Sequence, residues 1–250
     1  MRFRLKAFGL HLAGSACALT AVLGSLYLGW YRWPGWYLAS TAQVVGILVM
    51  VDLVLGPALT LLVANPGKQR STLARDIAII VTVQLTALVY GGITLWLGRP
   101  LYYTFSVDRL ELVQASDLNA ADIAVARRDN PRLAPYWNSL PRWIWAPLPD
   151  DPELVQKIVA GTLTGGADVI QMPKYFRPWD QGLPQLRAQL LPVDDIKYFS
   201  RAEKRGLRSR LARLGLPATQ PAIVMWGGSR RVLVLFDPAT LRVRAILNPD

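Results

Sequence analysis

The stretch VVGILVMVDLVLGPALTLLVA, residues 44–64, decides the fold. An α-helix rises about 1.5 Å per residue, so this stretch is long enough to cross the roughly 30 Å hydrocarbon layer of a bilayer. It is followed by Asn65-Pro66-Gly67, which is a strong turn signal. The sequence therefore predicts a transmembrane helix here, and the rest of the chain is interpreted outward from it.

Apolar runs of similar length lie on both sides of this stretch, at residues 10–30 and 77–97. The first run follows a basic start, Arg2 to Lys6, which is also typical of a secretory signal. We expect a retained anchor instead, because the run is longer than the about 7 to 15 apolar residues of a signal peptide. The sequence thus predicts three transmembrane helices within a membrane region of residues 1–99.

The distribution of charge predicts the orientation. Residues 1–99 carry eight basic and two acidic residues, and most of the basic ones lie at the N-terminus and in the loop 65–75. Because short basic loops face the cytoplasm, we expect a cytoplasmic N-terminus and place residues 100–250 on the outer side after three crossings. The net +6 of residues 1–99, out of +11 for the chain, therefore indicates topology signals in contact with the lipid bilayer, and we expect no nucleic-acid partner.

A second basic region lies in the outer half of the chain. Six basic residues fall between positions 201 and 213. This pattern favours a solvated helix face, with contact to anionic lipid headgroups or to an acidic partner as the alternative.

Asp52 is a carboxylic acid well inside the second apolar run. Burying its charge unpaired costs several kcal/mol in hydrocarbon, so we expect Asp52 to be protonated, partnered or close to an interface. One interpretation is an interhelical hydrogen bond that holds the bundle together, and the other is a site for a membrane-embedded ligand helix. The candidate partners are polar side chains of the third helix: Thr82, Gln84, Thr86 and Tyr90.

Gly56-Pro57 follows Asp52 by about one helical turn. Proline has no N–H to donate, so the sequence predicts a kink that leaves backbone carbonyls near Asp52 without their helical partners. A protonated Asp52 or the Thr60 hydroxyl could donate to these carbonyls. We interpret His11 as an interfacial or packing residue.

The outer half reads as an α+β domain. Strands are predicted at residues 101–107 and 110–114, and again at 222–226, 231–236 and 241–247. The turn Asp237-Pro238-Ala239-Thr240 joins the last two into a C-terminal β-hairpin. Helices are expected between the two groups of strands, the longest at residues 196–214, and the first strands are expected to pair with the last.

No catalytic, cofactor or metal site emerges from the sequence. The chain has one cysteine and one histidine, both in the membrane half, so a thiolate cluster or an activated serine in the outer domain is not expected. The segment Pro173–Trp179 combines aromatic and basic residues between prolines. It is either a recognition loop or a loop packed onto its own domain.

The motifs of the membrane half resemble the TfpX/TfpZ family of type IV pilin accessory proteins. They cover most of residues 6–113 and are KAFGLHL (6–12), VDLVLGP (51–57), NPGK (65–68), RDIA (75–78) and FSVDR (105–109). The resemblance implies a bacterial inner-membrane protein with a periplasmic domain. Such a protein binds a cognate major pilin and stabilises or presents it for pilus assembly, as a chaperone does and without an enzymatic reaction or a cofactor.

Other pilus assembly proteins are further expected partners. The candidate partner-binding residues in the membrane are Asp52, Gly56, Pro57, Gln84 and Tyr90. The candidates in the outer domain are Tyr175, Phe176, Arg177 and Trp179. The alternative hypothesis is a membrane-anchored periplasmic sensor or ligand-binding protein.

Overall fold

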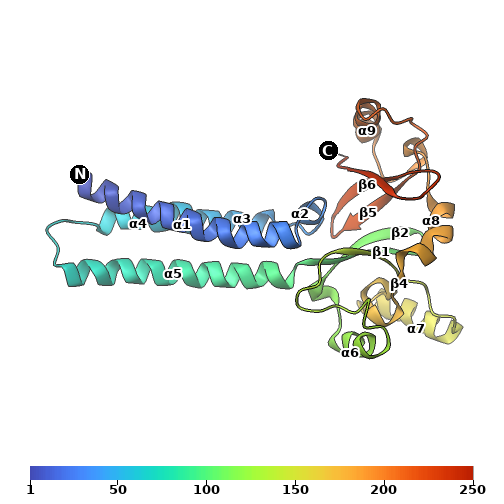
Figure 1. Cartoon of the computed structure of the whole chain (residues 1–250), viewed down its shortest axis with the longest axis horizontal. Helices are drawn as coiled ribbons and strands as arrows, with labels where there is room; N and C mark the ends of the chain where they lie inside the picture. Colours follow the sequence, from blue (N-terminus) through green and yellow to red (C-terminus); the bar gives the residue numbers. More distant parts are fainter. Residues whose placement is uncertain (250) are drawn as a thin grey trace. The chain divides into compact units, whose positions relative to one another are not determined.

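The computed structural model describes residues 1–249, which form two compact units. The membrane unit contains residues 1–32 and 41–98, and the sheet domain contains residues 33–40 and 99–249. Figure 1 shows the long helices of the first unit and the sheet of the second. The eight residues 33–40 thus belong with a domain that the chain builds only after its third long helix.

The membrane unit confirms the predicted helices. Within the described residues, three helical spans are long and apolar enough to cross a bilayer: α1 (Arg2–Gly29), the continuous span Ala42–Val63, and α5 (Arg70–Leu97). α1 and α5 begin earlier than predicted, because the charged residues that precede each apolar run continue the helix. The chain is therefore a membrane-associated protein with three N-terminal transmembrane helices followed by a soluble α+β domain.

The middle span changes its helical geometry at Asp52. It consists of α3 (Ala42–Val49), the π-helical segment η1 (Met50–Leu55) and α4 (Gly56–Val63). The sequence predicts a disturbance from Pro57, and the structure places a wider helical turn directly before it. Such π-helical turns are often found at functional sites.

The sheet domain is built on a mixed seven-stranded sheet with the order β4-β3-β1-β2-β5-β6-β7. Neighbouring strands are antiparallel except for the pairs β1–β3 and β2–β5. The strands are β1 (Pro100–Ser106), β2 (Arg109–Gln114), β3 (Arg142–Trp145), β4 (Arg177–Pro178), β5 (Ala222–Gly227), β6 (Arg230–Phe236) and β7 (Val243–Leu247). The predicted pairing of first with last strands is confirmed, since Leu110 and Glu111 lie opposite Met225 and Trp226.

The predicted C-terminal hairpin is β6–β7, in which Leu233 lies opposite Leu247. Asp237 caps its turn, because its Oδ1 accepts hydrogen bonds from the Ala239 and Thr240 N–H groups at 3.1 and 2.9 Å. The last strand begins at Val243, two residues later than predicted. β3 and β4 were not predicted from the sequence.

The sheet domain also contains helices. They are α2 (Gly35–Leu38), α6 (Ala120–Asp129), α7 (Pro152–Leu163), α8 (Leu183–Gln189) and α9 (Arg201–Arg213), with short 3₁₀ turns at η2 (Ala115–Asp117), η3 (Val169–Gln171), η4 (Pro173–Tyr175), η5 (Trp179–Gly182) and η6 (Val193–Asp195). α9 begins later than the predicted residue 196, because Ser200 and Glu203 form a reciprocal capping box.

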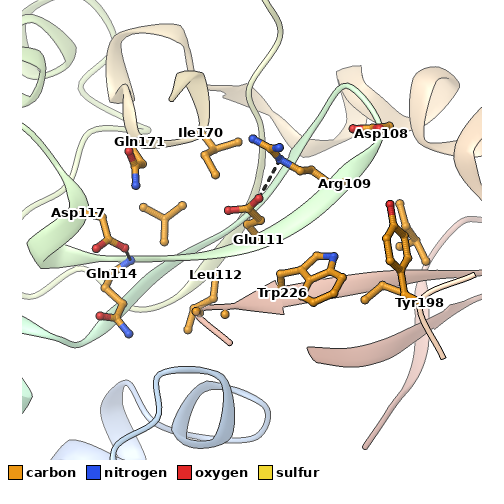
Figure 2. A pocket seen from close by; sticks show the side chains of 15 residues that line it. Asp108, Arg109, Glu111, Leu112, Gln114, Asp117, Ile170, Gln171, Tyr198 and Trp226 are labelled. Carbon is orange, nitrogen blue, oxygen red and sulfur yellow. Dashed lines mark hydrogen bonds and ion pairs between the residues drawn. The ribbon is translucent and has the colours of Figure 1, made fainter. Parts of the chain in front are cut away.

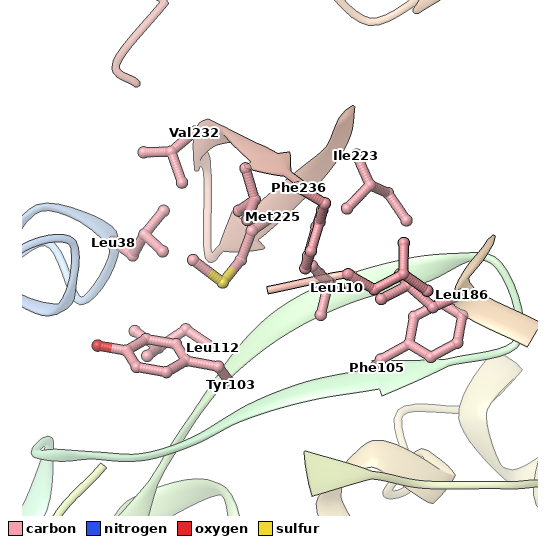
Figure 3. Close-up of a cluster of buried hydrophobic side chains, with 12 residues drawn as sticks. Leu38, Tyr103, Phe105, Leu110, Leu112, Leu186, Ile223, Met225, Val232 and Phe236 are labelled. Carbon is pink, nitrogen blue, oxygen red and sulfur yellow. The ribbon is translucent and has the colours of Figure 1, made fainter. Parts of the chain in front are cut away.

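The sheet buries an apolar cluster on each face. One cluster contains Phe105, Leu110, Met225 and Phe236, and Figure 3 shows Leu38 of α2 among these strand residues. The other cluster joins Leu207 and Leu211 of α9 to residues of β5 and β6. Because Leu38 is only 1% exposed, the loop between the first two transmembrane helices completes the core of the sheet domain.

Polar contacts fix the same loop in place. The Trp33 indole N–H donates to the Ile246 carbonyl at 3.0 Å, and the Arg230 guanidinium lies 4.8 Å from the centre of the Tyr37 ring. A Cβ atom on Gly227 would lie 2.5 Å from the Cβ of Leu38, so this close approach requires glycine. A compact domain cannot straddle a bilayer. Two candidate spans, an even number, lie between residues 40 and 99, which agrees with residues 33–40 and 99–249 forming one domain.

Candidate functional site

A hydrogen-bonded network of polar side chains lies inside the membrane unit, where its members come from α1, η1, α4 and α5. Asp52 is 3% exposed and Gln84 is 6% exposed. Buried polar groups in an apolar environment are stable only when they are hydrogen-bonded, so each bond in this network contributes to the geometry of the bundle.

Gln84 repairs the backbone defect that Pro57 creates. The Gly56 N–H donates to the Val51 carbonyl, five residues back, and the next residue is Pro57, which has no N–H for the Asp52 carbonyl. The Gln84 amide N–H₂ group lies 3.1 Å from the Asp52 carbonyl oxygen and 3.4 Å from that of Val51. The third helix thus supplies the donor that the second one lacks.

His11 of α1 extends the network to a third helix. Its Nε2 lies 2.6 Å from the Gln84 Oε1, which can only accept, so Nε2 carries a proton and donates it. Its Nδ1 lies 2.5 Å from the Thr60 hydroxyl, which donates to it when the imidazole is neutral. His11 was expected to be an interfacial or packing residue, and the structure gives it hydrogen bonds that link α4 and α5.

The four side chains of α5 that were predicted as possible partners of Asp52 differ in where they lie. Gln84 is buried in the network, whereas the Thr86 hydroxyl donates to the Thr82 carbonyl of its own helix at 2.9 Å. Tyr90 is 75% exposed and lies on a different face of α5. Of the polar side chains considered for Asp52, Gln84 alone reaches its backbone.

Gly56 and Pro57 have structural roles around Gln84. Both residues are buried. A Cβ atom on Gly56 would lie 2.0 to 2.3 Å from the Gln84 amide group, so any larger residue displaces that amide from its acceptors. These two candidates are therefore placed where they shape the network, and neither presents a side chain to a neighbouring protein.

A groove of about 410 Å³ opens beside the network, and we call it the α1–α5 groove. Ala7, Gly14 and Ala18 form one wall, and Ile77, Val81 and Leu85 form the other. Its polar floor is Asp52 with His11 and Gln84. The Oδ2 atom of Asp52 is buried and has no hydrogen-bond partner among residues 1–249.

The sequence carries a signal for the α1 wall of this groove. Ala7, His11, Gly14, Ser15 and Ala18 recur at intervals of three or four residues, so they share one face of α1. Small and polar residues on one face of an apolar helix are typical of helix–helix interfaces in membranes.

The aromatic segment in the sheet domain is packed inward. Phe176 is fully buried, and its ring centre lies 4.9 Å from that of Tyr102. The Trp179 ring lies 5.2 Å from that of Trp143. Tyr175 is half-buried, and Arg177 is the exposed side chain of the four candidates.

The sheet domain has a larger groove of its own, of about 640 Å³, where β2 and β5 meet (Figure 2). Glu111, Asp117 and Gln171 lie on one side, and Tyr198 and Trp226 lie on the other. Arg109 binds Glu111 at 2.8 Å and also pairs with Asp168. We call this the sheet groove.

The acidic side of the sheet groove is partly shielded from water. Burial raises the pKa of the Glu111 carboxyl above its usual value, Arg109 lowers it, and Asp168 and Asp117 raise it further. Burial also raises the pKa of Asp117, against the hydrogen bond from the Gln114 N–H. No local sequence pattern indicates this groove, because its lining residues come from separate segments between positions 108 and 228.

The chain is similar to three fimbrial assembly proteins of Dichelobacter nodosus. It is 24% identical to the protein of serogroup I over 193 residues, which cover 76% of this chain and 73% of that protein. The protein of serogroup E1 gives the same identity and coverage. The protein of serogroups C1 and C2 is 26% identical over 116 residues, which cover 46% of this chain and 88% of that protein.

An alignment of 193 residues is longer than either compact unit, so the likeness includes parts of both. No family model matches the chain, and no solved structure matches it.

Proposed function

We propose that this chain is an accessory protein of type IV pilus assembly, which binds a cognate major pilin in the bacterial inner membrane and stabilises or presents it before assembly. It acts as a chaperone does and catalyses no reaction. The observation that carries the proposal is the likeness to proteins named fimbrial assembly proteins, which extends over 76% of the chain and includes both units.

The architecture suits such a client. A pilin subunit awaiting assembly has one apolar helix in the membrane and a globular head outside it. A helper protein then needs membrane helices and an outer domain, and this chain has three transmembrane helices joined to a sheet domain. In the proposed orientation the N-terminus is cytoplasmic and the sheet domain is periplasmic, as the basic loop 65–75 favours.

Deletion of the gene tests the proposal directly. We expect the amount of the major pilin and the number of pili to fall, and both to return when the wild-type gene is supplied. Purification of the tagged protein in a mild detergent should recover the pilin with it. Normal piliation in the deletion strain together with the absence of pilin from the purified protein would refute the proposal.

The orientation has its own test. A reporter that is active only in the periplasm, fused after residue 250, should be active, and the same reporter in the loop 65–75 should be inactive. The reverse pattern would exclude direct contact between the sheet domain and a periplasmic pilin head.

A second function is favoured by the sheet groove, whose acidic and aromatic walls enclose about 640 Å³. In that case the chain would be a membrane-anchored sensor or ligand-binding protein of the periplasm. Substitution of Trp226 by alanine in this groove would then abolish function while pilin still co-purifies. Under the pilin-binding proposal, loss of pilin recovery accompanies loss of piliation.

A further inference from the structure

We propose that the α1–α5 groove is the seat of a single transmembrane helix of the client pilin, and that this helix brings a hydrogen-bond donor to the Oδ2 atom of Asp52. The inference rests on the proposed function and adds to it the place of contact and the chemistry that the client helix must offer.

The groove is an open space on one side of α5, whereas another side of the same helix is closely packed. On the α3 side of α5, a Cβ atom on Gly91 would lie 2.6 Å from the Leu48 side chain, which marks two helices in close contact. On the α1 wall, a Cβ atom on Gly14 would meet nothing within 4 Å. The third helix therefore packs against the middle span and leaves a gap beside α1.

The walls of the groove suit a helix. Ala7, Gly14 and Ala18 keep the surface of α1 low, and small residues allow helix backbones to approach closely in a membrane. The opposite wall presents exposed apolar side chains, of which Val81 is 36% and Leu85 is 53% exposed. Small residues facing large ones create a surface into which the side chains of another helix can interdigitate.

Asp52 determines which polar group the helix in the groove must carry. Asp52 lines the groove and is only 3% exposed, yet its Oδ2 atom has no hydrogen-bond partner within residues 1–249. Three polar side chains near it have contacts elsewhere in the network. The Gln84 amide contacts backbone carbonyls, the His11 Nε2 donates to Gln84, and the Thr60 hydroxyl contacts the His11 Nδ1.

The free acceptor identifies the class of occupant. Water is scarce in the hydrocarbon layer and lipid chains carry no donor, so a lipid would fill the groove without satisfying Oδ2. A helix with a serine, threonine, asparagine, glutamine or basic side chain at this depth satisfies both the apolar walls and the carboxyl group. The pilin helix is the membrane-embedded part of the proposed client.

Photo-cross-linking tests the proposal in the full-length protein in cells that express the major pilin. The photoreactive residue p-benzoylphenylalanine replaces Leu85, which lines the groove and is 53% exposed, or Val83, which is 61% exposed and does not line it. These positions lie on nearly opposite faces of α5, because successive residues are about 100° apart. We expect a cross-link to the pilin from position 85 and little or none from position 83.

Variants at Asp52 test the hydrogen bond. Asp52→Leu should lower the yield of the position 85 cross-link by about 5- to 30-fold, as expected for the loss of one buried hydrogen bond in a membrane. Asp52→Asn should retain most of the yield, because the Asn side-chain carbonyl still accepts. Gly14→Leu should also lower the yield by filling the groove, and its open surroundings allow the protein to fold even if Asp52→Leu does not.

Co-purification of the pilin separates failure of this inference from failure of the proposed function. If pilin still co-purifies but cross-links equally from both positions, or position 85 forms lipid adducts only, the groove is not the seat. An undiminished cross-link in both Asp52→Leu and Gly14→Leu would also overturn the inference. If no pilin co-purifies with the wild-type protein, the proposed function fails as well.

Discussion

Gln84 in the membrane unit and Arg142 in the sheet domain perform the same task with different chemistry. Gln84 donates at 3.1 Å to the Asp52 carbonyl that Pro57 leaves unpaired, and it lies 3.4 Å from the Val51 carbonyl. Arg142 holds the carbonyls of Arg132, Leu133 and Ala134, at 2.6 to 3.1 Å. The domain in contact with water uses a charged guanidinium, whereas the helices in the membrane use a neutral amide, because a charge in hydrocarbon is far more costly.

The comparison shows why Asp52 is distinctive. The ion pairs of the sheet domain, such as Arg231 with Glu203 at 2.8 Å, keep 29% and 20% of their side chains exposed. An imperfectly paired charge there can be hydrated. A polar atom without a partner in the membrane unit has no such alternative, so the Asp52 Oδ2 atom indicates a missing partner more strongly than a similar atom in the sheet domain would.

The largest effect is expected for Arg142→Met. This change removes the donor to three carbonyls of the loop 132–134 and the guanidinium that lies 5.3 Å from the Tyr102 ring centre. We expect the free energy of unfolding of the sheet domain to fall by about 3 kcal/mol. Thermal unfolding followed by tryptophan fluorescence measures it. Arg142→Lys should have an intermediate stability. If Arg142→Met is as stable as the wild-type protein, the guanidinium does not stabilise the loop 132–134.

Gln84→Leu is expected to destabilise the membrane unit by about 2 kcal/mol, because it leaves the Asp52 carbonyl and the His11 Nε2–H without partners. The measurement is unfolding of the protein in detergent, followed by helical circular dichroism. Thr86→Val on the same helix is the matched control, since its hydroxyl contacts only the Thr82 carbonyl. Equal stability of the two variants would contradict a structural role for the network.

A smaller effect is expected at high pH from Tyr103, whose phenol lies against the apolar face of the sheet. Burial raises the pKa of Tyr103 from 10.0 to about 12. The unfolded chain therefore loses this proton first, and the stability that the buried phenol contributes is full below pH 10 and declines as the pH rises toward 12. At pH 11 the loss is about 1.4 kcal/mol.

The variant Tyr103→Phe isolates the contribution of the Tyr103 phenol to the pH dependence of stability. Wild-type and variant proteins are compared by their melting temperatures at pH 8 and pH 11, so that effects of other titrating groups are common to both. The wild-type protein should lose more stability between the two pH values than the variant does. Parallel losses would show that the phenol is hydrated.

The smallest effect is expected for Arg208→Gln on α9. Arg208 binds Asp194 at 2.6 Å, but 52% and 43% of the two side chains are exposed. Exposed ion pairs contribute little, so the change in stability should be below about 0.5 kcal/mol. A neutral result in detergent combined with weaker binding to anionic lipid vesicles would favour the lipid-contact interpretation of the basic segment 201–213 over a solvated helix face.

The features that the sequence predicted are those that depend on neighbouring residues. Residues 44–64 predict a transmembrane span because length and hydrophobicity are local properties. The hairpin turn at Asp237 is local too. β3 was missed because its four residues, Arg142–Trp145, are too short to show a periodic pattern. The start of α9 was predicted too early, at residue 196, because the capping box of Ser200 and Glu203 begins the helix at Arg201.

The candidate site was only partly predictable for the same reason. Asp52 can be recognised as a candidate site residue from sequence alone, because it is an acidic residue in an apolar run. The sequence also predicts Gln84 as one of its possible partners. The link through His11 joins residues 49 and 73 positions apart, and no local pattern encodes such a distance. The packing of Phe176 and Trp179 into the domain likewise depends on strands elsewhere in the chain.

The docking of residues 33–40 has a consequence for biosynthesis. Leu38 leaves the ribosome long before Val232, one of the residues with which it shares a core, so the loop must wait during the synthesis of nearly two hundred further residues. Contacts between such distant positions form late and slowly. An excised fragment that starts at residue 99 would lack this plug and would expose an apolar hollow to aggregation.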